Sequence, residues 1–177
     1  GGKIGMAMVR NPRVDKIAFT GSTEVGKQIM REASGTLKRL SLELGGKSPN
    51  IVFADADMEA AVRGAMTGIF YNKGEVCAAG SRLFLEQSIH DEFMSKLTDR
   101  VKTFKVGDPM DKATRMGPVV SKAQMETVLG YIETGKREGA QLVAGGQRAS
   151  VGNGKGYYVE PTIFDGVSNS MTIAREE

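Results

Sequence analysis

The sequence predicts an α/β fold with a largely parallel sheet. Short, apolar, strand-like segments alternate with longer segments whose apolar residues recur every three or four positions. Glycine or a helix-capping residue marks most of the junctions between them. Because parallel strands need long crossover connections, which are usually helices, this alternation favours parallel pairing.

Half of a strand–helix–strand unit is predicted near the amino end. Residues 14–20 form an apolar strand-like segment, and Gly21-Ser22-Thr23 ends it. The hydroxyl of Ser22 or Thr23 is suited to accept a hydrogen bond from the first turn of a following helix. The apolar positions of that helix are Val25, Ile29 and Ala33.

Two further strands and the clearest helix of the chain come next. Residues 40–44 and 50–53 are predicted strands, separated by the Gly45-Gly46 turn. Asp57 is placed to cap the helix that follows. The apolar face of this helix consists of Met58, Ala61, Val62, Ala65, Met66 and Ile69. This pattern indicates that the helix packs one face on a core.

The second half of the chain continues the alternation. A strand is predicted over 82–85, and Ser88-Ile89-His90-Asp91 resembles a capping box that opens a helix. Ser121 is predicted to open another helix, which ends between residues 135 and 139. A strand is predicted over 141–144.

Composition argues against several functional classes. The 177 residues are 40% hydrophobic and 25% charged, as in an ordinary globular chain, and the formal net charge is +3. The charges are scattered, without a basic cluster for a phosphate backbone, so we expect no nucleic-acid partner. No apolar run is long enough to span a bilayer, so we expect no membrane partner. One unpaired cysteine is typical of a reducing compartment, which predicts a cytoplasmic protein.

The most informative stretch is residues 72–82. It places the only cysteine, Cys77, in a loop between a strongly periodic helix and a short strand. A thiol in such a loop is a candidate nucleophile. A free cysteine is also commonly a small buried hydrophobic residue without reactivity. The flanking Gly74 and Gly80 favour an open loop, and therefore the nucleophile.

A carboxylate and a helix start form two further candidates. Glu43 lies at a predicted strand end, and Gly45-Gly46 lets the backbone approach a ligand closely. Gly21 and Ser22 precede a helix whose first amides and dipole suit a phosphate group. Each feature also has an explanation without a ligand. Glu43 is then a solvated surface carboxylate, and Ser22 is an ordinary helix cap.

His90, the only histidine, is a candidate partner for the thiol in a Cys-His protease or transferase. The capping pattern around it instead predicts a surface histidine in the first turn of a helix. One histidine and one cysteine cannot supply the ligands of a structural zinc site, so no metal is expected.

Three motifs in this order and spacing go beyond the separate signals. They are Phe19-Thr20-Gly21-Ser22-Thr23-Glu24-Val25-Gly26, Leu42-Glu43-Leu44-Gly45-Gly46-Lys47-Ser48 and Gly74-Glu75-Val76-Cys77-Ala78-Ala79-Gly80-Ser81-Arg82. Together they closely resemble the aldehyde dehydrogenase superfamily, and the resemblance covers the whole chain. It implies an aldehyde-dehydrogenase-like α/β fold with parallel-sheet Rossmann-type domains.

The resemblance also implies a domain division and a longer protein. Residues 1–45 would be the C-terminal part of the NAD(P)-binding domain, and residues 46–177 a truncated catalytic domain. The chain has no initiating Met and stops at Ala174-Arg175-Glu176-Glu177, before the family's usual Ile-Phe-Gly-Pro. The family's oxyanion-hole Asn and first nucleotide-binding strands are missing from these residues. We therefore expect the chain alone to be inactive.

A role for each candidate residue follows from the resemblance. Cys77 would attack the carbonyl of a small-molecule aldehyde, and loss of hydride to NAD or NADP would turn the thiohemiacetal into a thioester. Glu43 would act as general base in hydrolysis of that thioester. The cofactor would be bound by Gly21 and Ser22 at the pyrophosphate, by the backbone of Leu44 at the nicotinamide and by Glu177 at the nicotinamide ribose. The full-length protein would be a homodimer or homotetramer.

One residue departs from the family pattern, and two other functions stay open. The family usually has Gln where Glu75 stands, and we expect this carboxylate to point away from the thiol, because a nearby negative charge disfavours the thiolate. A relative that passes the acyl group to coenzyme A, or that reduces an acyl phosphate, would not need Glu43. A non-catalytic structural or binding member of the same fold is the third possibility.

Overall fold

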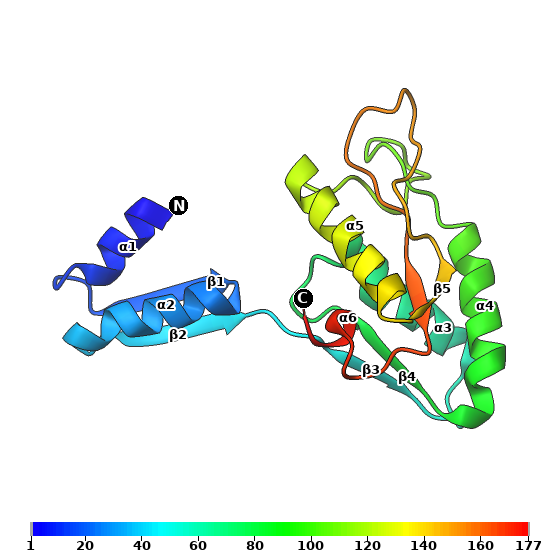
Figure 1. The fold of residues 1–177 in the computed structure, drawn as a ribbon, viewed down its shortest axis with the longest axis horizontal. Helices are drawn as coiled ribbons and strands as arrows, with labels where there is room; N and C mark the ends of the chain where they lie inside the picture. Colours follow the sequence, from blue (N-terminus) through cyan, green and yellow to red (C-terminus); the bar gives the residue numbers. More distant parts are fainter. Residues whose placement is uncertain (1, 177) are drawn as a thin grey trace. The chain divides into compact units, whose positions relative to one another are not determined.

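The computed structural model describes residues 2–176, and the chain divides into two compact units, residues 1–46 and residues 47–177. The elements of the first unit are α1 (Gly2–Arg10), β1 (Lys16–Gly21), α2 (Thr23–Ala33), the short 3-10 helix η1 (Ser34–Thr36) and β2 (Arg39–Leu44). β1 and β2 pair in parallel through the crossover helix α2, as predicted. Helix α2 covers one face of this pair, and α1 packs on α2 (Figure 1).

The first unit has a small core between its helices and its sheet. Its buried residues are Val9, Ile17, Ile29 and Ala33. Helix α1 was not among the predicted elements, and its glycines lower its intrinsic helix propensity. It is attached to α2 by Val9 in this core and by Arg10, whose guanidinium donates two hydrogen bonds, of 2.8 and 3.0 Å, to the carboxylate of Glu32.

The second unit holds the remaining elements of the chain. They are β3 (Pro49–Val52), α3 (Met58–Phe70), η2 (Tyr71–Gly74), β4 (Arg82–Leu85), η3 (Gln87–Ile89), α4 (His90–Lys102), α5 (Lys122–Arg137), β5 (Gln141–Ala144), β6 (Ile163–Asp165) and α6 (Thr172–Arg175). β3 and β4 pair in parallel, with Ile51 opposite Phe84. β5 and β6 pair antiparallel, with an irregularity between Leu142 and Ala144, so the parallel prediction does not extend to this pair.

The main core of the second unit lies between helices α3 and α4 and the β3–β4 pair. Val62 of α3 and Phe93 of α4 are its largest fully buried side chains. The other buried members are Val52, Ala65, Met66, Phe70, Leu97, Val101 and Met116. The apolar face predicted for α3 therefore packs on the core. A second cluster joins Met125 and Ile132 of α5 to Val119 and Val159.

Three of the predicted helix caps are present. The side chain of Ser22 accepts a hydrogen bond from the Val25 amide at 3.3 Å, Asp57 accepts one from Ala60 at 2.9 Å, and Ser121 accepts one from Gln124 at 3.2 Å. In each case the acceptor lies three residues before its donor, which is the spacing that local sequence signals describe.

The capping box predicted at residues 88–91 is wrong, although the helix itself is present. Helix α4 begins at His90, after the 3-10 turn η3, and no side chain caps it. The hydroxyl of Ser88 instead donates to the carboxylate of Glu86 at 3.1 Å. The N-cap position of α4 is held by Ile89, so Ser88 lies one residue too early to cap this helix.

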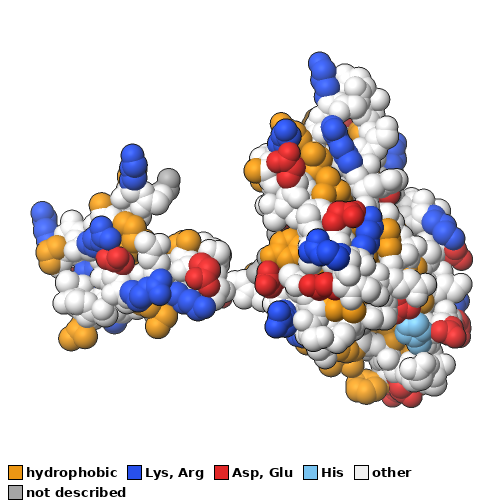
Figure 2. Space-filling model, viewed as in Figure 1, with side chains coloured by type: hydrophobic (Ala, Val, Ile, Leu, Met, Phe, Trp, Pro, Cys, Tyr) orange, Lys and Arg blue, Asp and Glu red, His pale blue; other side chains and the backbone are white. Residues whose placement is uncertain are grey.

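The surface of the second unit carries an apolar face on its parallel strands. Ile51 and Phe84 lie opposite each other on β3 and β4, and both are exposed, as is Phe53 beyond the end of β3. Figure 2 shows apolar side chains gathered along the lower edge of this unit, where β3 and β4 lie. Basic and acidic side chains are interspersed on the visible face of each unit, without a single basic patch.

Candidate active site

Four of the six predicted site residues come together at the carboxyl ends of β1 and β2. The register places Thr20 opposite Glu43 and Gly21 opposite Leu44, and Ser22 follows directly as the residue before α2. Ligands of open α/β sheets bind at the carboxyl ends of parallel strands. Glu177, the predicted ribose ligand, lies outside the described residues.

The first turn of α2 is suited to an anion. Ser22 has extended backbone angles (φ −69°, ψ 149°), and its hydroxyl satisfies the amide of Val25. The amides of Thr23 and Glu24 have no acceptor among residues 2–176. Two unsatisfied donors at the positive end of a helix dipole fit a pyrophosphate group.

Close packing explains why two positions near this edge are glycine. A Cβ at Gly26 would lie 2.7 and 2.9 Å from the two methyl carbons of Leu44, so the Leu44 side chain sits directly on α2. A Cβ at Gly21 would lie 2.5 Å from the ring of Phe19. Side chains alternate along a strand, and Glu43 is exposed on the other face of β2 from Leu44. The carboxylate is therefore solvent-accessible, while Leu44 anchors the strand end.

The loop that carries Cys77 begins with three consecutive residues of left-handed backbone. The φ angles are 47° at Asn72, 63° at Lys73 and 79° at Gly74. Such a conformation costs about 1–3 kcal/mol for each non-glycine residue. The Asn72 side chain stabilises the turn by donating to the Glu75 carbonyl at 3.0 Å. Strain of this kind is concentrated at functional sites, and Gly74 and Asn72 are of residue types that favour the left-handed conformation.

The thiol itself lies at the outer tip of an anchored turn. Ala79 donates to the Val76 carbonyl at 2.9 Å, which closes a turn around Cys77, and Gly80 donates to Gly68 of α3 at 3.0 Å. Cys77 is a free, exposed cysteine, so the alternative of a buried structural cysteine is wrong. Within the described part of the chain, the Cys77 amide has no acceptor. An unengaged amide beside a nucleophile is the donor that an oxyanion needs.

The charge of Glu75 is compensated within the loop. Its carboxylate lies 3.5 Å from the ammonium group of Lys73, which also donates to the Asn72 side chain at 2.9 Å. The residue that departs from the family pattern thus has its own cation two positions away.

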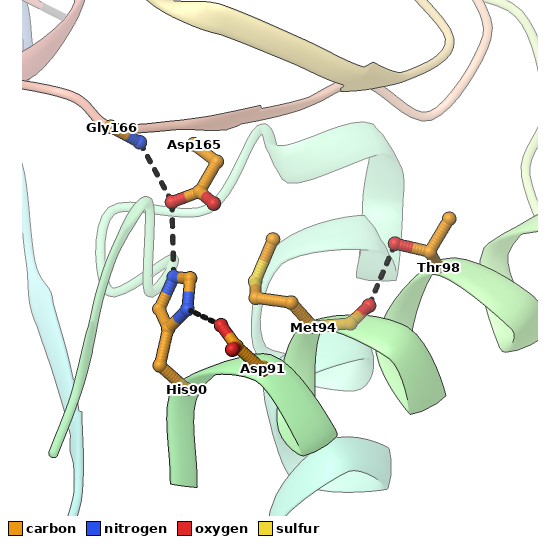
Figure 3. Close-up of polar contacts among 6 residues, drawn as sticks. All are labelled: His90, Asp91, Met94, Thr98, Asp165 and Gly166. Atoms are coloured by element: carbon orange, nitrogen blue, oxygen red, sulfur yellow. Dashed lines mark hydrogen bonds and ion pairs between the residues drawn. The ribbon is translucent and has the colours of Figure 1, made fainter. Parts of the chain in front are cut away.

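His90 has other partners than a thiol. Its Nδ1 lies 2.8 Å from Asp91 and its Nε2 lies 3.2 Å from Asp165 (Figure 3). The neighbouring carboxylates of Asp91 and Asp165 raise the pKa of His90. As predicted, His90 lies in the first turn of a helix and is partly exposed, and it also joins α4 to the end of β6 through Asp165. With both ring nitrogens engaged, a Cys-His pair is not formed.

Two further classes of site are absent from residues 2–176. No group of three or more His, Cys, Asp or Glu side chains there is arranged to hold a metal ion. No helix in the same range combines the length and apolar character needed to cross a bilayer.

The motifs and geometry agree with a comparison against known families. The model of the aldehyde dehydrogenase family matches residues 1–177. The chain belongs to this family. Betaine aldehyde dehydrogenase of Rhizobium johnstonii is 51% identical over 173 residues, which is 98% of this chain and 36% of that protein. Mitochondrial 10-formyltetrahydrofolate dehydrogenase of Mus musculus is 49% identical over 178 residues, covering 100% of this chain and 19% of that protein.

Solved structures confirm the aldehyde dehydrogenase fold. The NAD+ complex of an aldehyde dehydrogenase from Bacillus cereus matches 98% of this chain with a TM-score of 0.93 and 50% sequence identity. The match covers 35% of that chain. The present chain therefore spans little more than a third of the length of its bacterial relatives.

Proposed function

We propose that this chain provides the nucleophile, the general base and part of the cofactor site of an NAD(P)-dependent aldehyde dehydrogenase. The observation that carries the proposal is Cys77, an exposed thiol at the tip of a strained, anchored loop, with its own amide unengaged. The similarity to an aldehyde dehydrogenase whose structure contains NAD+ supports the same function, as do the three motifs in register.

The loop geometry suits acyl chemistry on sulfur. The Cys77 thiolate attacks the aldehyde carbonyl, a carbon–sulfur bond forms, and the Cys77 amide donates to the resulting oxyanion. NAD(P), if bound, would supply the hydride acceptor that oxidation of the thiohemiacetal carbon requires. This leaves a thioester on Cys77. Water then attacks the thioester carbonyl, and the carbon–sulfur bond breaks to release the carboxylic acid and the thiol.

Glu43 is proposed to take the proton from that water. Its exposure at the end of β2 leaves the carboxylate accessible, as a general base must be. The cofactor would be held at the same strand ends. Gly21 and Ser22 would present the α2 amides to the pyrophosphate, and the Leu44 backbone would lie at the nicotinamide. Glu177 would bind the nicotinamide ribose.

The domain assignment and the cellular setting are part of the proposal. Residues 1–45 would complete the NAD(P)-binding domain, and residues 46–177 would belong to the catalytic domain. The expected substrate is a small-molecule aldehyde, and the relatives named betaine aldehyde dehydrogenase make a quaternary-ammonium aldehyde a useful first test. We propose a cytoplasmic homodimer or homotetramer. The exposed apolar face of β3 and β4 supports packing against further polypeptide.

The test is NADH formation by the full-length polypeptide that carries this sequence. Betaine aldehyde and a panel of aliphatic aldehydes are offered with NAD+ or NADP+, and absorbance of the reduced cofactor is followed. Cys77→Ser abolishes turnover while cofactor binding persists, and Ser95→Ala on the exposed side of α4 is the matched control. Cofactor binding without turnover of any aldehyde would favour a non-catalytic role.

Glu43→Gln separates the hydrolytic enzyme from its acyl-transferring relatives. In the hydrolytic enzyme this change slows steady-state turnover by about 100-fold or more, while a first burst of NADH remains, because general base catalysis typically contributes 10²–10⁴-fold. Unchanged turnover that depends on coenzyme A or phosphate would instead support the acyl-transfer alternative.

A further inference from the structure

One partly buried lysine bridges the loop that carries Cys77. The side chain of Lys73 is only 19% exposed, although it lies in the 3-10 turn η2. Lysine side chains are rarely withdrawn from solvent unless they are paired. The ammonium group of Lys73 lies 3.5 Å from the Glu75 carboxylate and donates to the side-chain oxygen of Asn72 at 2.9 Å. We call Asn72, Lys73 and Glu75, joined in this way, the lysine bridge.

Asn72 closes the lysine bridge onto the backbone. Its side-chain oxygen accepts from Lys73, and its side-chain nitrogen donates to the Glu75 carbonyl at 3.0 Å. The Glu75 amide in turn donates to the Asn72 carbonyl at 3.1 Å. Glu75 is therefore held at its amide, at its carbonyl and at its carboxylate. A residue fixed at three points has little freedom to turn its carboxylate in another direction.

The backbone at Lys73 is linked to the position of its cation. Its φ angle is 63°, a left-handed conformation that is uncommon for lysine. Such a conformation persists only where surrounding contacts hold it. The contacts of the ammonium group with Asn72 and Glu75 supply such support. The shape of the loop and the place of the positive charge therefore depend on each other.

Two tight turns connect Glu75 to the thiol. The Val76 amide donates to the Gly74 carbonyl at 2.9 Å, and Glu75 has φ −80° and ψ 61°, which is the geometry of an inverse γ-turn. The turn that Ala79 closes onto Val76 then contains Cys77. Even a fully extended chain would separate the Cα atoms of residues 75 and 77 by no more than roughly 7 Å. A charge on Glu75 is thus within electrostatic reach of the thiol.

Compensation of this charge matters for a nucleophilic thiol. The thiolate is the reactive form of a cysteine, and a nearby carboxylate disfavours it. The oxyanion that forms when a thiolate attacks a carbonyl is negative as well. An uncompensated Glu75 would oppose both charges, whereas a carboxylate with an ammonium group 3.5 Å away presents little net charge to its surroundings.

We propose that Lys73 is a positioning residue for the nucleophile, because its ammonium group holds the Glu75 carboxylate in the lysine bridge and cancels its charge at Cys77. The inference rests on the proposed function, since it assigns Lys73 to the reaction of Cys77. Lys73 acts through Glu75 and touches no substrate. The lysine bridge also explains how this chain can carry glutamate beside its thiol, where the family usually has glutamine.

The experiment compares the alkylation of Cys77 by an anionic and a neutral reagent in the full-length polypeptide. Iodoacetate is negatively charged and iodoacetamide is not, so the ratio of their rate constants reports the electrostatic potential at the thiol. The fraction of thiolate cancels in this ratio. The modified Cys77 peptide is quantified by mass spectrometry at low ionic strength. We expect Lys73→Met to lower the iodoacetate-to-iodoacetamide ratio about two- to fourfold, as one unit charge at roughly 5–10 Å does in a largely aqueous medium.

Three further variants identify the cause of this change. Glu75→Gln, added to Lys73→Met, restores the parent ratio, because no uncompensated charge remains. Lys73→Arg retains a cation and retains the ratio. The matched control is Lys96→Met, which removes an ammonium group paired with Glu59 at the far end of α3 from the loop. This control leaves the ratio unchanged.

The outcomes separate the role of Lys73 from the proposed function. An unchanged ratio in Lys73→Met, or a lowered ratio that Glu75→Gln does not restore, overturns the proposal. Equal slowing with both reagents also overturns it, because this indicates a distorted loop and not a changed charge. If Cys77→Ser retains turnover, the proposed function itself fails, whatever the ratios are.

The burst of reduced cofactor in the first turnover tests the link to the reaction. We expect the burst to slow in Lys73→Met and to recover when Glu75→Gln is added. A burst that keeps the parent rate in Lys73→Met, despite a lowered alkylation ratio, would overturn the positioning role. Inactive Cys77→Ser together with unchanged alkylation ratios would leave the proposed function standing and remove only the role of Lys73.

Discussion

Removal of the His90 side chain changes how stability depends on pH. His90 lies between two carboxylates, with Nδ1 2.8 Å from Asp91 and Nε2 3.2 Å from Asp165, and the Gly166 amide donates to the same Asp165 oxygen at 2.7 Å. Both ring nitrogens donate only in the imidazolium form. Deprotonation therefore removes one of these two hydrogen bonds and the positive charge that strengthens both. The His90→Gln variant lacks the charge at every pH.

The sign follows from the direction of the pKa change. The Asp91 and Asp165 carboxylates raise the pKa of His90 above the ordinary histidine value of about 6.5, so the folded state binds the proton more tightly than the unfolded state. The stabilisation is complete below about pH 6.5 and is lost as the pH rises through the higher folded-state pKa of His90. Asp91 makes the shorter contact but is fully exposed, whereas the side chains of His90 and Asp165 are only 30% and 31% exposed. We expect the Asp165 pair to contribute about 0.5–1 kcal/mol, a value already reduced for solvent screening.

The assay is urea unfolding at pH 5.5 and pH 9 in a Cys77→Ser background, so that the thiol does not titrate. Between pH 5.5 and pH 9, the free energy of unfolding of the Cys77→Ser parent falls by about 0.5–1 kcal/mol more than that of the variant that also carries His90→Gln. This corresponds to a difference of about 0.3 M in how far the urea midpoints of the two proteins shift. Asp165→Asn removes most of this pH-dependent loss, and Asp91→Asn, its exposed counterpart, removes less of it. Because His90 is the only histidine of the 177 residues, its imidazole resonances report the pKa of His90 directly. Identical pH slopes for His90→Gln and its parent would refute the reasoning.

Two further predictions concern packing. Phe93→Ala, at a fully buried position between α3 and α4, lowers the free energy of unfolding by about 3–5 kcal/mol. Phe53→Ala, at an exposed position, changes it by less than about 0.5 kcal/mol. Equal urea midpoints for the two variants would contradict the assigned core. Gly26→Ala places a Cβ 2.7 Å from the Leu44 side chain. We expect it to lower the free energy of unfolding by about 1–2 kcal/mol, although alanine has the better helix propensity. It also weakens NAD+ binding, because it displaces the end of β2. The control is Gly64→Ala on α3, where a Cβ meets no atom within 4 Å. If Gly26→Ala instead stabilised the protein, the Leu44 side chain would be free to move away from the new methyl group.

The sequence alone was sufficient for features whose partners are close in the chain. The caps at Ser22, Asp57 and Ser121 each receive their hydrogen bond from an amide three residues later, so residue type and spacing predict them. The periodic apolar face of α3 likewise predicts burial without knowledge of what it packs against. The exposed thiol loop and the family also follow from motifs in the sequence.

Other features depended on contacts that local patterns do not contain. Helix α1 is attached through Arg10 and Glu32, which are 22 positions apart. The α4 capping box is absent because Ile89, and not Ser88, occupies the N-cap position. The left-handed angle at Lys73 has no counterpart in the intrinsic preference of lysine, whereas asparagine, as at position 72, is enriched in this conformation.

The proposed site shows the same difference between features set by neighbouring residues and features set by distant contacts. The sequence by itself predicted which residues are the candidates for the chemistry, because a thiol, a carboxylate and a helix start are properties of the residues and their neighbours. Only the tertiary structure decided how Leu44 is seated on Gly26. Contacts between distant residues form only when the whole unit folds, since the entropy lost in closing such long loops is offset by the burial of the entire core.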